Sequence, residues 1–464
     1  MKKTVIVYGN YSGIQINAIK YLSETVLDYT GKFPVCISHT EFKEDENSRY
    51  IFIGTKENNP YIKKLSDKEL THREEYYIKV FNDNAIIEGS DEGGVLYGCI
   101  DFYGKYIVNY RNTHAKDYFK NIFENKLPDF EYSSYPLIRD RGLWTWGHVI
   151  YDYKGYIDSM VRLKMNTVII WNDYVPVNAA EMIEYAHNSN IKIFWGFPWG
   201  WDTACDKIDI KSLDKLCDSV IEEYEKSYAK LGGDGIYFQS FTELSQETIG
   251  GILIAQAVTD FVNQTAEKLF KKHPTLELQF GLHATSVKER LDYIKNINPK
   301  ITITWENCGA FPYDGIPQNI KNFDNTCDFT KKIISLRGEN EKFGAVLKGF
   351  TGLDWSAFEH QGGRYYLGHS SEHMQADRLR RKENIWRYVQ AYWLKNADKA
   401  LEMIRLMQNE SNGNICITAL VEDGMLERRL YYPVALFAQM LWDCSAALSD
   451  IMCETALNSY VTFA

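Results

Sequence analysis

From Arg139 onward, short apolar runs typical of buried strands alternate with stretches whose apolar residues recur at helical spacing. Strands are predicted at 142–146, 167–171, 192–197, 235–241, 276–283, 301–305, 344–350 and 414–421. Helices are predicted near 153–164, 178–189, 210–231, 249–272, 286–295, 326–336, 376–409 and 428–448. Eight strands, each followed by a helix, predict an α/β fold closed as a (β/α)8 (TIM) barrel with C-terminal helices packed on it. Residues that follow the strands of such a barrel meet at one mouth, so they are the candidates for chemistry.

Residues 1–130 predict a smaller α+β domain before the barrel. Short strands are expected at 4–8, 50–54, 76–81 and 85–88, with helices at 14–28 and from Gly93 to about Tyr106. Asn82-Asp83-Asn84 between two strands indicates a hairpin, because Asn and Asp tolerate left-handed backbone. We therefore expect one mostly antiparallel sheet. The polar, proline-marked stretch 128–136 is interpreted as the domain boundary, which assigns 137–464 to the barrel and its C-terminal helices.

Charge and hydropathy exclude several classes of partner. The net charge of −10 argues against nucleic acid, since no basic face could offset phosphate repulsion. The basic cluster 378–382 lies in a predicted helix and is interpreted as a solvated face. No segment has the roughly 20 consecutive apolar residues of a membrane helix, and the N-terminal apolar run is too short for a signal peptide. We expect a cytoplasmic chain without a membrane partner. The apolar C-terminal helices suit either a homodimer face or packing on the barrel.

Cysteine and histidine spacing gives no sign of a metal centre. The nine cysteines never form a CxxC pair, and residues such as Cys99, Cys217 and Cys416 are interpreted as small buried hydrophobes in a reducing compartment. No HxH or HExxH spacing and no phosphate-binding glycine motif occurs. We therefore expect neither a metal nor a cofactor. A barrel lyase or isomerase would need one of these features.

Eight of the eleven tryptophans fall where a predicted strand runs into a loop, close to acidic residues. Indole rings stack on the C–H faces of sugars, and carboxylates bind sugar hydroxyls. The pattern predicts a carbohydrate pocket, although aromatic residues of an ordinary core are the alternative. The expected walls of this pocket are Trp146, Trp171, Trp199, Trp201, Trp305 and Trp355.

Acidic residues follow several of the same strands. Glu243 comes after the fourth strand, Glu306 after the sixth and Asp354 after the seventh. Cleavage of a glycosidic bond uses one protonated carboxyl as acid and one carboxylate as base or nucleophile. Glu243 is the candidate acid, and either Glu306 or Asp354 is its partner. As the alternative, Glu243 caps a helix and Asp354 supports an Asx-turn.

Polar residues near other strand ends could bind sugar hydroxyls. The candidates are Asn172, Asp173 and His283, of which His283 could equally be a structural histidine. The glycine-rich loop 359–366 could cover the site.

Two segments resemble known glycoside hydrolases. The stretch 86–98 contains Gly89-Ser90-Asp91-Glu92-Gly93-Gly94-Val95-Leu96-Tyr97-Gly98. It resembles the accessory domain before the barrel in β-N-acetylhexosaminidases (family 20) and α-glucuronidases (family 67). The stretch 139–143 resembles their first barrel strand, where an arginine grips hydroxyls of the terminal sugar. Arg141 is the matching position, so the resemblance implies that it binds substrate.

The sequence departs from family 20 after the fourth strand. That family has an Asp-Glu pair there, whereas this chain has Thr242-Glu243. The resemblance implies an exo-acting glycoside hydrolase, either N-acetylhexosaminidase-like or α-glucuronidase-like, whose substrate is an oligosaccharide or glycoconjugate. The alternative hypothesis is a catalytically decayed carbohydrate-binding protein on the same scaffold.

Overall fold

The computed structural model describes most of the chain, in thirteen segments. These are residues 2–113, 129–146, 150–172, 174–200, 210–284, 286–306, 323–338, 341–350, 363–366, 371–421, 424–427, 429–458 and 460–464. The chain forms two compact units. The first comprises 1–136 with 187–190 and 452–459, and the second comprises 137–186, 191–451 and 460–464. The first long segment of the first unit ends at Pro136, and the second unit begins at Leu137.

The first unit contains a six-stranded sheet in the order β2-β1-β3-β5-β4-β6. Its elements are β1 (Lys3–Tyr8), α1 (Ile14–Thr30), β2 (Val35–Ser38), β3 (Ser48–Gly54), α2 (Pro60–Leu65), β4 (Tyr76–Phe81), β5 (Asn84–Gly89), α3 (Glu92–Thr113) and β6 (Phe130–Ser134). The expectation of a mostly antiparallel sheet is wrong. β1, β2, β3 and β5 run parallel, and only β4 pairs antiparallel with its two neighbours. The β1–α1–β2 connection explains this, because a crossover through a helix makes parallel neighbours.

Two local features of this sheet follow from single residues. Asn82 and Asp83 have φ values of 49° and 68°, so the predicted hairpin between β4 and β5 is confirmed. The stretch interpreted as a linker contains β6, which pairs with β4 from Phe130 to Ser134. Phe130 and Tyr132 are partly buried while Glu131 is exposed, the alternation of a strand with one covered face.

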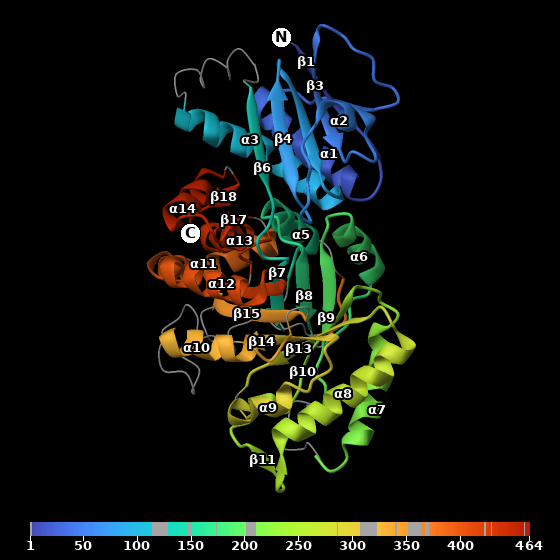
Figure 1. Cartoon of the computed structure of the whole chain (residues 1–464), viewed down its shortest axis with the longest axis vertical. Coiled ribbons are helices and arrows are strands. Elements are labelled where there is room, and N and C mark those ends of the chain that lie inside the picture. The colour runs from blue at the N-terminus through green and yellow to red at the C-terminus, as the bar shows by residue number, and fades with distance from the viewer. Residues whose placement is uncertain are drawn as a thin grey trace. The chain divides into compact units, whose positions relative to one another are not determined.

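The second unit is a closed parallel barrel in the order β10-β13-β14-β15-β16-β7-β8-β9 (Figure 1). The strands are β7 (Asp140–Trp146), β8 (Thr167–Trp171), β9 (Lys192–Gly196), β10 (Gly235–Gln239), β13 (Glu277–Leu282), β14 (Ile301–Glu306), β15 (Phe343–Phe350) and β16 (Ile415–Val421). Each coincides with a predicted strand to within two residues at either end. The predicted eight-stranded barrel is confirmed.

Side chains from six of the eight strands fill the barrel interior. The buried cluster consists of Trp144, Ile169, Trp171, Phe194, Tyr237, Val346 and Leu420. Because successive side chains of a strand point to opposite faces, these positions identify the inward set of each strand. On β10 the inward set continues from Tyr237 to Gln239, toward the carboxyl end where the mouth lies.

Helices surround the barrel. They are α5 (Tyr153–Arg162), α6 (Ala179–His187), α7 (Leu213–Glu223), a π-helical turn (Tyr224–Tyr228), α8 (Ile254–Lys272), α9 (Leu291–Ile294), α10 (Phe323–Ile334), α11 (Glu372–Lys395), α12 (Ala397–Ser411), α13 (Tyr432–Trp442) and α14 (Leu448–Leu457). Short elements are the 3-10 turns Phe241–Glu243 and Lys288–Arg290, and the strands β11 (Thr248–Ile249), β12 (Ile252–Leu253), β17 (Leu430–Tyr431) and β18 (Val461–Thr462). α14 is divided between the units, with 448–451 in the second and 452–457 in the first.

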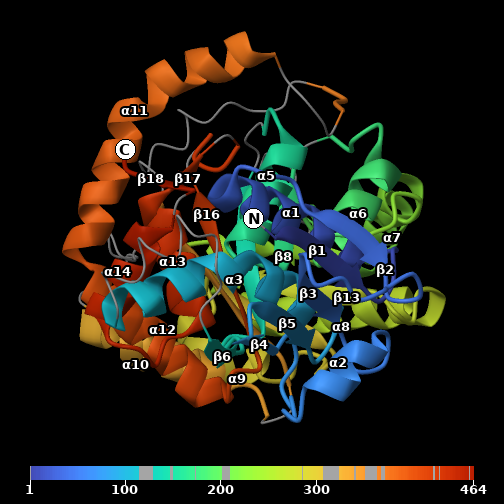
Figure 2. The same ribbon diagram turned by 90° about the horizontal axis from the view of Figure 1, so that it is seen from above.

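The C-terminal helices differ in number from the prediction. The single helix expected at 376–409 is two helices, α11 and α12, which meet at Asn396 (Figure 2). Trp386, Trp393 and Trp442 are buried, and Trp393 Nε1 donates a hydrogen bond of 3.0 Å to the carbonyl of Gly349 on β15. Packing on the barrel therefore accounts for this apolar surface.

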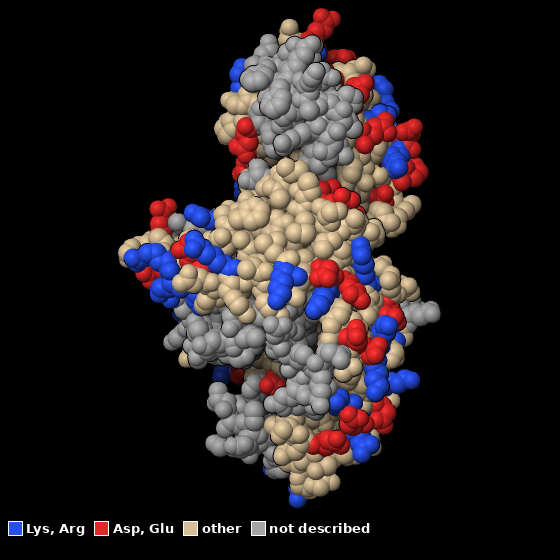
Figure 3. Space-filling view, turned by 90° about the vertical axis from the view of Figure 1, so that its left-hand side faces the viewer, with Lys and Arg blue, Asp and Glu red and all other residues tan. Residues whose placement is uncertain are grey.

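The basic cluster on α11 is only partly solvated. Arg380 and Arg381 are exposed and pair with Asp377, whereas Arg378 and Lys382 are buried. Where charged side chains occur on the face in Figure 3, positive and negative ones lie near each other, and a broad area between them is formed by other residues. The interpretation as a solvated face holds for Arg380 and Arg381 but not for their two buried neighbours.

Other predictions concerned cysteines and membranes. Cys99, Cys217 and Cys416 are buried free thiols, as predicted. Among the described residues, the helices are too short or too polar to cross a bilayer.

Candidate active site

Three side chains from separate strand ends meet at the mouth of the barrel. His283 directly follows β13, Glu306 ends β14, and Glu243 lies in the 3-10 turn after β10. The His283 Nε2 atom is 2.9 Å from Glu243 Oε1 and 2.9 Å from Glu306 Oε2. These two carboxylate oxygens are therefore no more than twice that distance apart. Residues that are far apart in the sequence share one rim.

Glu306 is surrounded by hydrogen-bond donors. Its Oε1 accepts from Tyr237 Oη at 2.5 Å and from Gln239 Nε2 at 2.5 Å, and its Oε2 accepts from Lys348 Nζ at 2.5 Å. Burial would raise the pKa of Glu306, but His283 and Lys348 together hold that pKa well below its ordinary value. A buried carboxylate that accepts three hydrogen bonds, one of them from the Lys348 ammonium, stays ionised.

Lys348 contacts the same Oε2 atom of Glu306 that His283 contacts. It is almost fully buried on β15, and its Nζ lies 5.0 Å from the centroid of the Trp144 ring. A cation over an indole face is attracted by the ring quadrupole. Trp144 therefore helps to hold the Lys348 ammonium in contact with Glu306.

Gly281 provides the space in which Glu306 meets Tyr237. A Cβ atom at residue 281 would lie 2.4 Å from the Tyr237 hydroxyl and 2.5 Å from Glu306 Oε1. Both distances are shorter than van der Waals contact. The glycine is therefore required by the close approach of two polar groups, and not by its backbone angles.

Exposure decides which carboxylate a ligand can reach. The Glu243 side chain is 39% exposed, His283 is 12% exposed and Glu306 is 0% exposed. The three side chains thus form a series from the mouth into the interior. Only Glu243 presents a carboxylate to solvent among these three.

Asn172 follows β8 at the same end of the barrel. Its Nδ2 donates to Tyr365 Oη at 2.8 Å and to Tyr153 Oη at 3.3 Å, and its buried Oδ1 has no hydrogen-bond partner. Burial raises the pKa of Tyr365 to about 12, so its hydroxyl stays protonated. A backbone hydrogen bond of 2.8 Å from Val177 N to Tyr365 O ties the described end of the glycine-rich loop to the segment after β8.

The tryptophans expected to wall the pocket divide between the two faces of the barrel wall. Trp171 faces the interior, 6.1 Å from the Tyr237 ring. Trp199 is fully buried and stacks on Phe238, and Trp305 packs against Phe329 of α10. Trp199 and Trp305 therefore face the helices, which corrects the expectation that they contact a sugar. The reason is strand alternation, since Trp305 and Glu306 are adjacent and must point to opposite faces.

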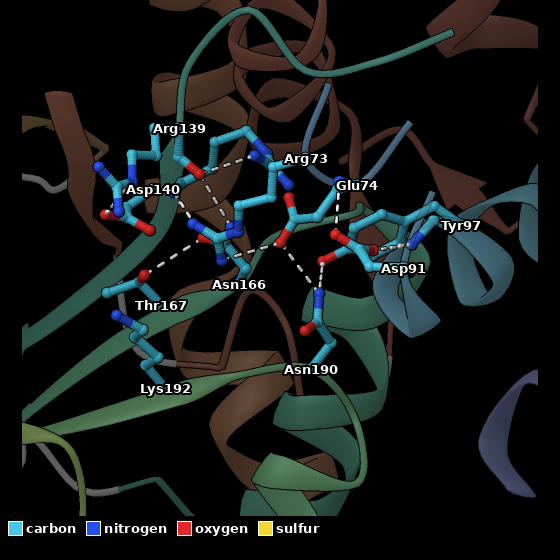
Figure 4. A network of polar contacts seen from close by, with 12 residues as sticks. Arg73, Glu74, Asp91, Tyr97, Arg139, Asp140, Asn166, Thr167, Asn190 and Lys192 are labelled. Carbon is cyan, nitrogen blue, oxygen red and sulfur yellow. Dashed lines mark hydrogen bonds and ion pairs between the residues drawn. The ribbon is translucent and has the colours of Figure 1, made fainter. Parts of the chain in front are cut away.

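Arg141 lies near the amino end of β7, away from the mouth. Its guanidinium donates to the carbonyls of Lys164 and Ile138 at 2.8–3.1 Å, and the side chain is 1% exposed. Its backbone N–H is bound by Asn166, which Figure 4 shows between Arg139 and Thr167. This placement does not support the expectation that Arg141 grips sugar hydroxyls. It ties the amino ends of β7 and β8 together.

Other candidates lie outside the described residues. These are Asp173, Trp201, Asp354 and Trp355. Trp146 ends β7 and its backbone pairs with Trp171, but its side chain is not among those described.

Sequence reasoning missed Tyr237, Gln239 and Lys348. A usable signal existed, because Lys348 is a lone charge inside the apolar strand 344–350, and an inward lysine needs a buried anion. Tyr237 and Gln239 share the inward face of β10 by alternation. Within the described parts of the chain, no three His, Cys, Asp or Glu side chains form a cluster that could hold a metal ion.

Comparison with known proteins rests on structure. No protein-family model and no curated protein matches the sequence. Among solved structures, a β-N-acetylhexosaminidase from Bacteroides fragilis matches with a TM-score of 0.55 and 13% identity, over 100% of this chain and 93% of that one. CpGH84B, a family 84 glycoside hydrolase, matches with a TM-score of 0.54 and 10% identity, over 98% of this chain and 70% of that one.

A third similar structure is a family 138 glycoside hydrolase that targets pectin rhamnogalacturonan II. Its TM-score is 0.54 and its identity 11%, over 97% of this chain and 52% of that one, so this chain spans about half of its length. The three likenesses show that this chain has the barrel fold of these glycoside hydrolases, with a preceding domain.

Proposed function

We propose that this chain is an exo-acting glycoside hydrolase that removes a terminal sugar from an oligosaccharide or glycoconjugate. The observation that carries the proposal is the convergence of Glu243 and Glu306 on His283 Nε2 at the mouth of the barrel, each at 2.9 Å. Active sites of such barrels lie at this end of the strands. The fold shared with three glycoside hydrolases supports the same class of reaction.

Glu243 is the general acid in this proposal. It is the solvent-accessible member of the cluster, so a glycosidic oxygen can approach it. Proton transfer from a positioned carboxyl to the leaving oxygen contributes about 10²–10⁴-fold to the rate. The protein supplies this group without a cofactor.

The second carboxylate is assigned to Asp354 and not to Glu306. Glu306 is enclosed by Tyr237, Gln239 and Lys348, and a sugar cannot reach it without displacing them. Asp354 is the other acid that the sequence offers after β15, the strand that also carries Lys348. Retention or inversion depends on its distance from Glu243, with about 5–5.5 Å for retention and about 6.5–9.5 Å for inversion.

Trp171 and Asn172, which are 6% and 7% exposed at the end of β8, are proposed to form the floor of the sugar pocket. Trp146, Asp173, Trp201 and Trp355 complete the proposed pocket. Thr242 is fully buried and carries no carboxylate, which argues against a mechanism that needs an acid there to orient an acetamido group. An α-glucuronidase-like reaction is therefore favoured over an N-acetylhexosaminidase-like one.

The test is a panel of aryl glycosides that includes uronides, hexosides and N-acetylhexosaminides. Glu243→Gln should reduce turnover of the best substrate by about 10²–10⁴-fold. The matched control is Glu247→Gln, an exposed carboxylate four residues further on that lies 3.9 Å from Arg290. Wild-type turnover by the Glu243 variant, with both variants folded, would overturn the assignment of the acid.

A carbohydrate-binding protein without activity is the second candidate, and Thr242 in place of an acid motivates it. Such a protein would change its tryptophan fluorescence with a sugar but release no aglycone from any member of the panel. Turnover that disappears with Glu243→Gln excludes this candidate.

A further inference from the structure

Glu306 and Glu243 contact the same nitrogen of His283 but differ in what they can do to it. Glu306 is fully buried and ionised, and an ionised carboxylate only accepts hydrogen bonds. His283 Nε2 faces two carboxylate oxygens at 2.9 Å and therefore carries a hydrogen; the amide Gln239 Nε2, 3.2 Å from the same nitrogen, donates to Glu306 Oε1 instead. The same N–H faces Glu243 Oε1 at 2.9 Å.

The environment of Glu306 keeps it in the acceptor role. Tyr237 Oη, Gln239 Nε2 and Lys348 Nζ all donate to it, and Gly281 leaves the space in which Glu306 meets Tyr237. Four contacts, from two residues of β10, one residue of β15 and His283 after β13, fix its two oxygens. Its orientation therefore sets the direction from which His283 can donate.

Backbone contacts hold His283 and Glu243 in register with each other. Ser286 N donates to the carbonyl of Thr242 at 3.1 Å, and Ser286 Oγ donates to the carbonyl of Phe241 at 3.4 Å. These bonds join the loop after β13 to the turn that carries Glu243. The residue after His283, Ala284, has φ +61°, a left-handed conformation that is uncommon for alanine.

We propose that Glu306 is a positioning residue that acts through His283: it fixes the Nε2–H tautomer and the ring direction of His283, and His283 in turn orients the carboxylate of Glu243. This inference rests on the proposed function for its consequence in turnover, but its first step concerns only the imidazole. A histidine fixed in this way is a hydrogen-bond donor to Glu243. It does not accept a proton at Nε2 in the resting protein.

The tautomer is measured without any substrate. Nitrogen NMR of ¹⁵N-histidine-labelled full-length protein reports which ring nitrogen carries hydrogen, and the spectrum of His283→Asn assigns the signal. The expected result is a protonated Nε2 for His283 in the wild type at neutral pH. In Glu306→Gln the preference should be lost, because the glutamine amide can also donate to Nε2.

A buried charge change can unfold a protein, so a second variant is needed. Glu306→Gln leaves Lys348 buried without its carboxylate, whereas the double variant Glu306→Gln with Lys348→Met removes both charges. Loss of the tautomer preference in the double variant, with a native circular dichroism spectrum, supports the inference. The inference is overturned if His283 Nε2 carries no hydrogen in the wild type. It is also overturned if the tautomer is unchanged in both folded variants.

Kinetics then test the second step. A misplacement of about 1 Å in the geometry of an active site can reduce activity by about 10²-fold. We expect Glu306→Gln to lower kcat with little change in KM, and His283→Gln, which retains a side-chain N–H, to keep more activity than His283→Ala. Equal activity of the two His283 variants contradicts the donor role. A protein that shows the predicted tautomer but no turnover with any glycoside would reject the proposed function and leave the tautomer result standing.

Discussion

The hydroxyl of Tyr237 donates a hydrogen bond of 2.5 Å to Glu306 Oε1 inside the barrel, between strands that are not neighbours. Gly281, on the strand between them, leaves the space that this bond occupies. The pair links the packed interior to the polar mouth, because Tyr237 belongs to the apolar cluster and Glu306 belongs to the cluster around His283.

Gly281→Ala should therefore separate Tyr237 from Glu306. The added Cβ would lie within 2.5 Å of both oxygen atoms, and overpacking of this kind destabilises by about 1–3 kcal/mol. Chemical unfolding measures the loss. Gly104→Ala is the control, since nothing lies within 4 Å of its added Cβ and alanine is the better helix former. Equal stability of the Gly281 variant and the wild type would contradict the packing described.

Ala284→Gly tests whether the conformation after His283 is strained. A left-handed backbone costs an alanine about 1–2 kcal/mol relative to glycine, while glycine loses more entropy on folding, by about 0.5–1 kcal/mol. We expect a melting temperature equal to that of the wild type or slightly higher. A control at an ordinary helical position is Ala266→Gly in α8, which should be destabilised by about 1 kcal/mol or more. A similar loss at both positions would show that residue 284 is not strained.

The barrel was predictable because its signal is repeated eight times. Each strand is an apolar run followed by a helical pattern, and an error at one boundary does not change the count. The sheet of the first unit was predicted less well. Its strand directions depend on which strands become neighbours, as the parallel pairing of β3 with β5 shows, and local sequence carries little information about that choice.

The candidate site was predictable in part for the same reason. Position after a strand placed Glu243, His283 and Glu306 at one mouth, and the structure brings them together. Position alone does not tell which face a side chain takes. Strand alternation would have separated Trp305 from Glu306, and Arg141 would have been recognised as too early in β7 to reach the mouth.

The orientation of Trp199 gives a prediction about sugar binding. Trp199 stacks on Phe238 with ring centroids 3.6 Å apart and is fully buried, so Trp199→Ala should reduce stability by about 3–5 kcal/mol. The affinity of the folded fraction for a sugar ligand should not change. Trp171→Ala should weaken binding directly, as its ring lines the interior. Isothermal titration calorimetry below the melting temperature distinguishes the Trp199 and Trp171 variants. Weaker sugar binding by a folded Trp199 variant would show that Trp199 does line the pocket.

Glu427 makes the stability of the barrel unit depend on pH. It lies between β16 and β17, its Oε1 is 2.6 Å from Arg378 Nη1, and its Oε2 accepts from Tyr151 N at 3.0 Å. Burial raises the pKa of Glu427 from 4.5 to about 7, although Arg378 and the backbone donor oppose the shift. The folded state therefore binds more protons than the unfolded state between these two values, and the contribution of Glu427 to stability falls as pH rises through this window.

The expected effect is a loss of up to about 3 kcal/mol in wild-type stability relative to Glu427→Gln between pH 5 and pH 8. Glutamine can still accept a backbone hydrogen bond but does not titrate, so the variant lacks this part of the pH dependence. Denaturant unfolding of both proteins at several pH values gives the difference, with Glu289→Gln as a control for an exposed carboxylate. If the wild type instead gains stability over the variant as pH rises, Arg378 outweighs burial and the Glu427 carboxylate is the favoured form.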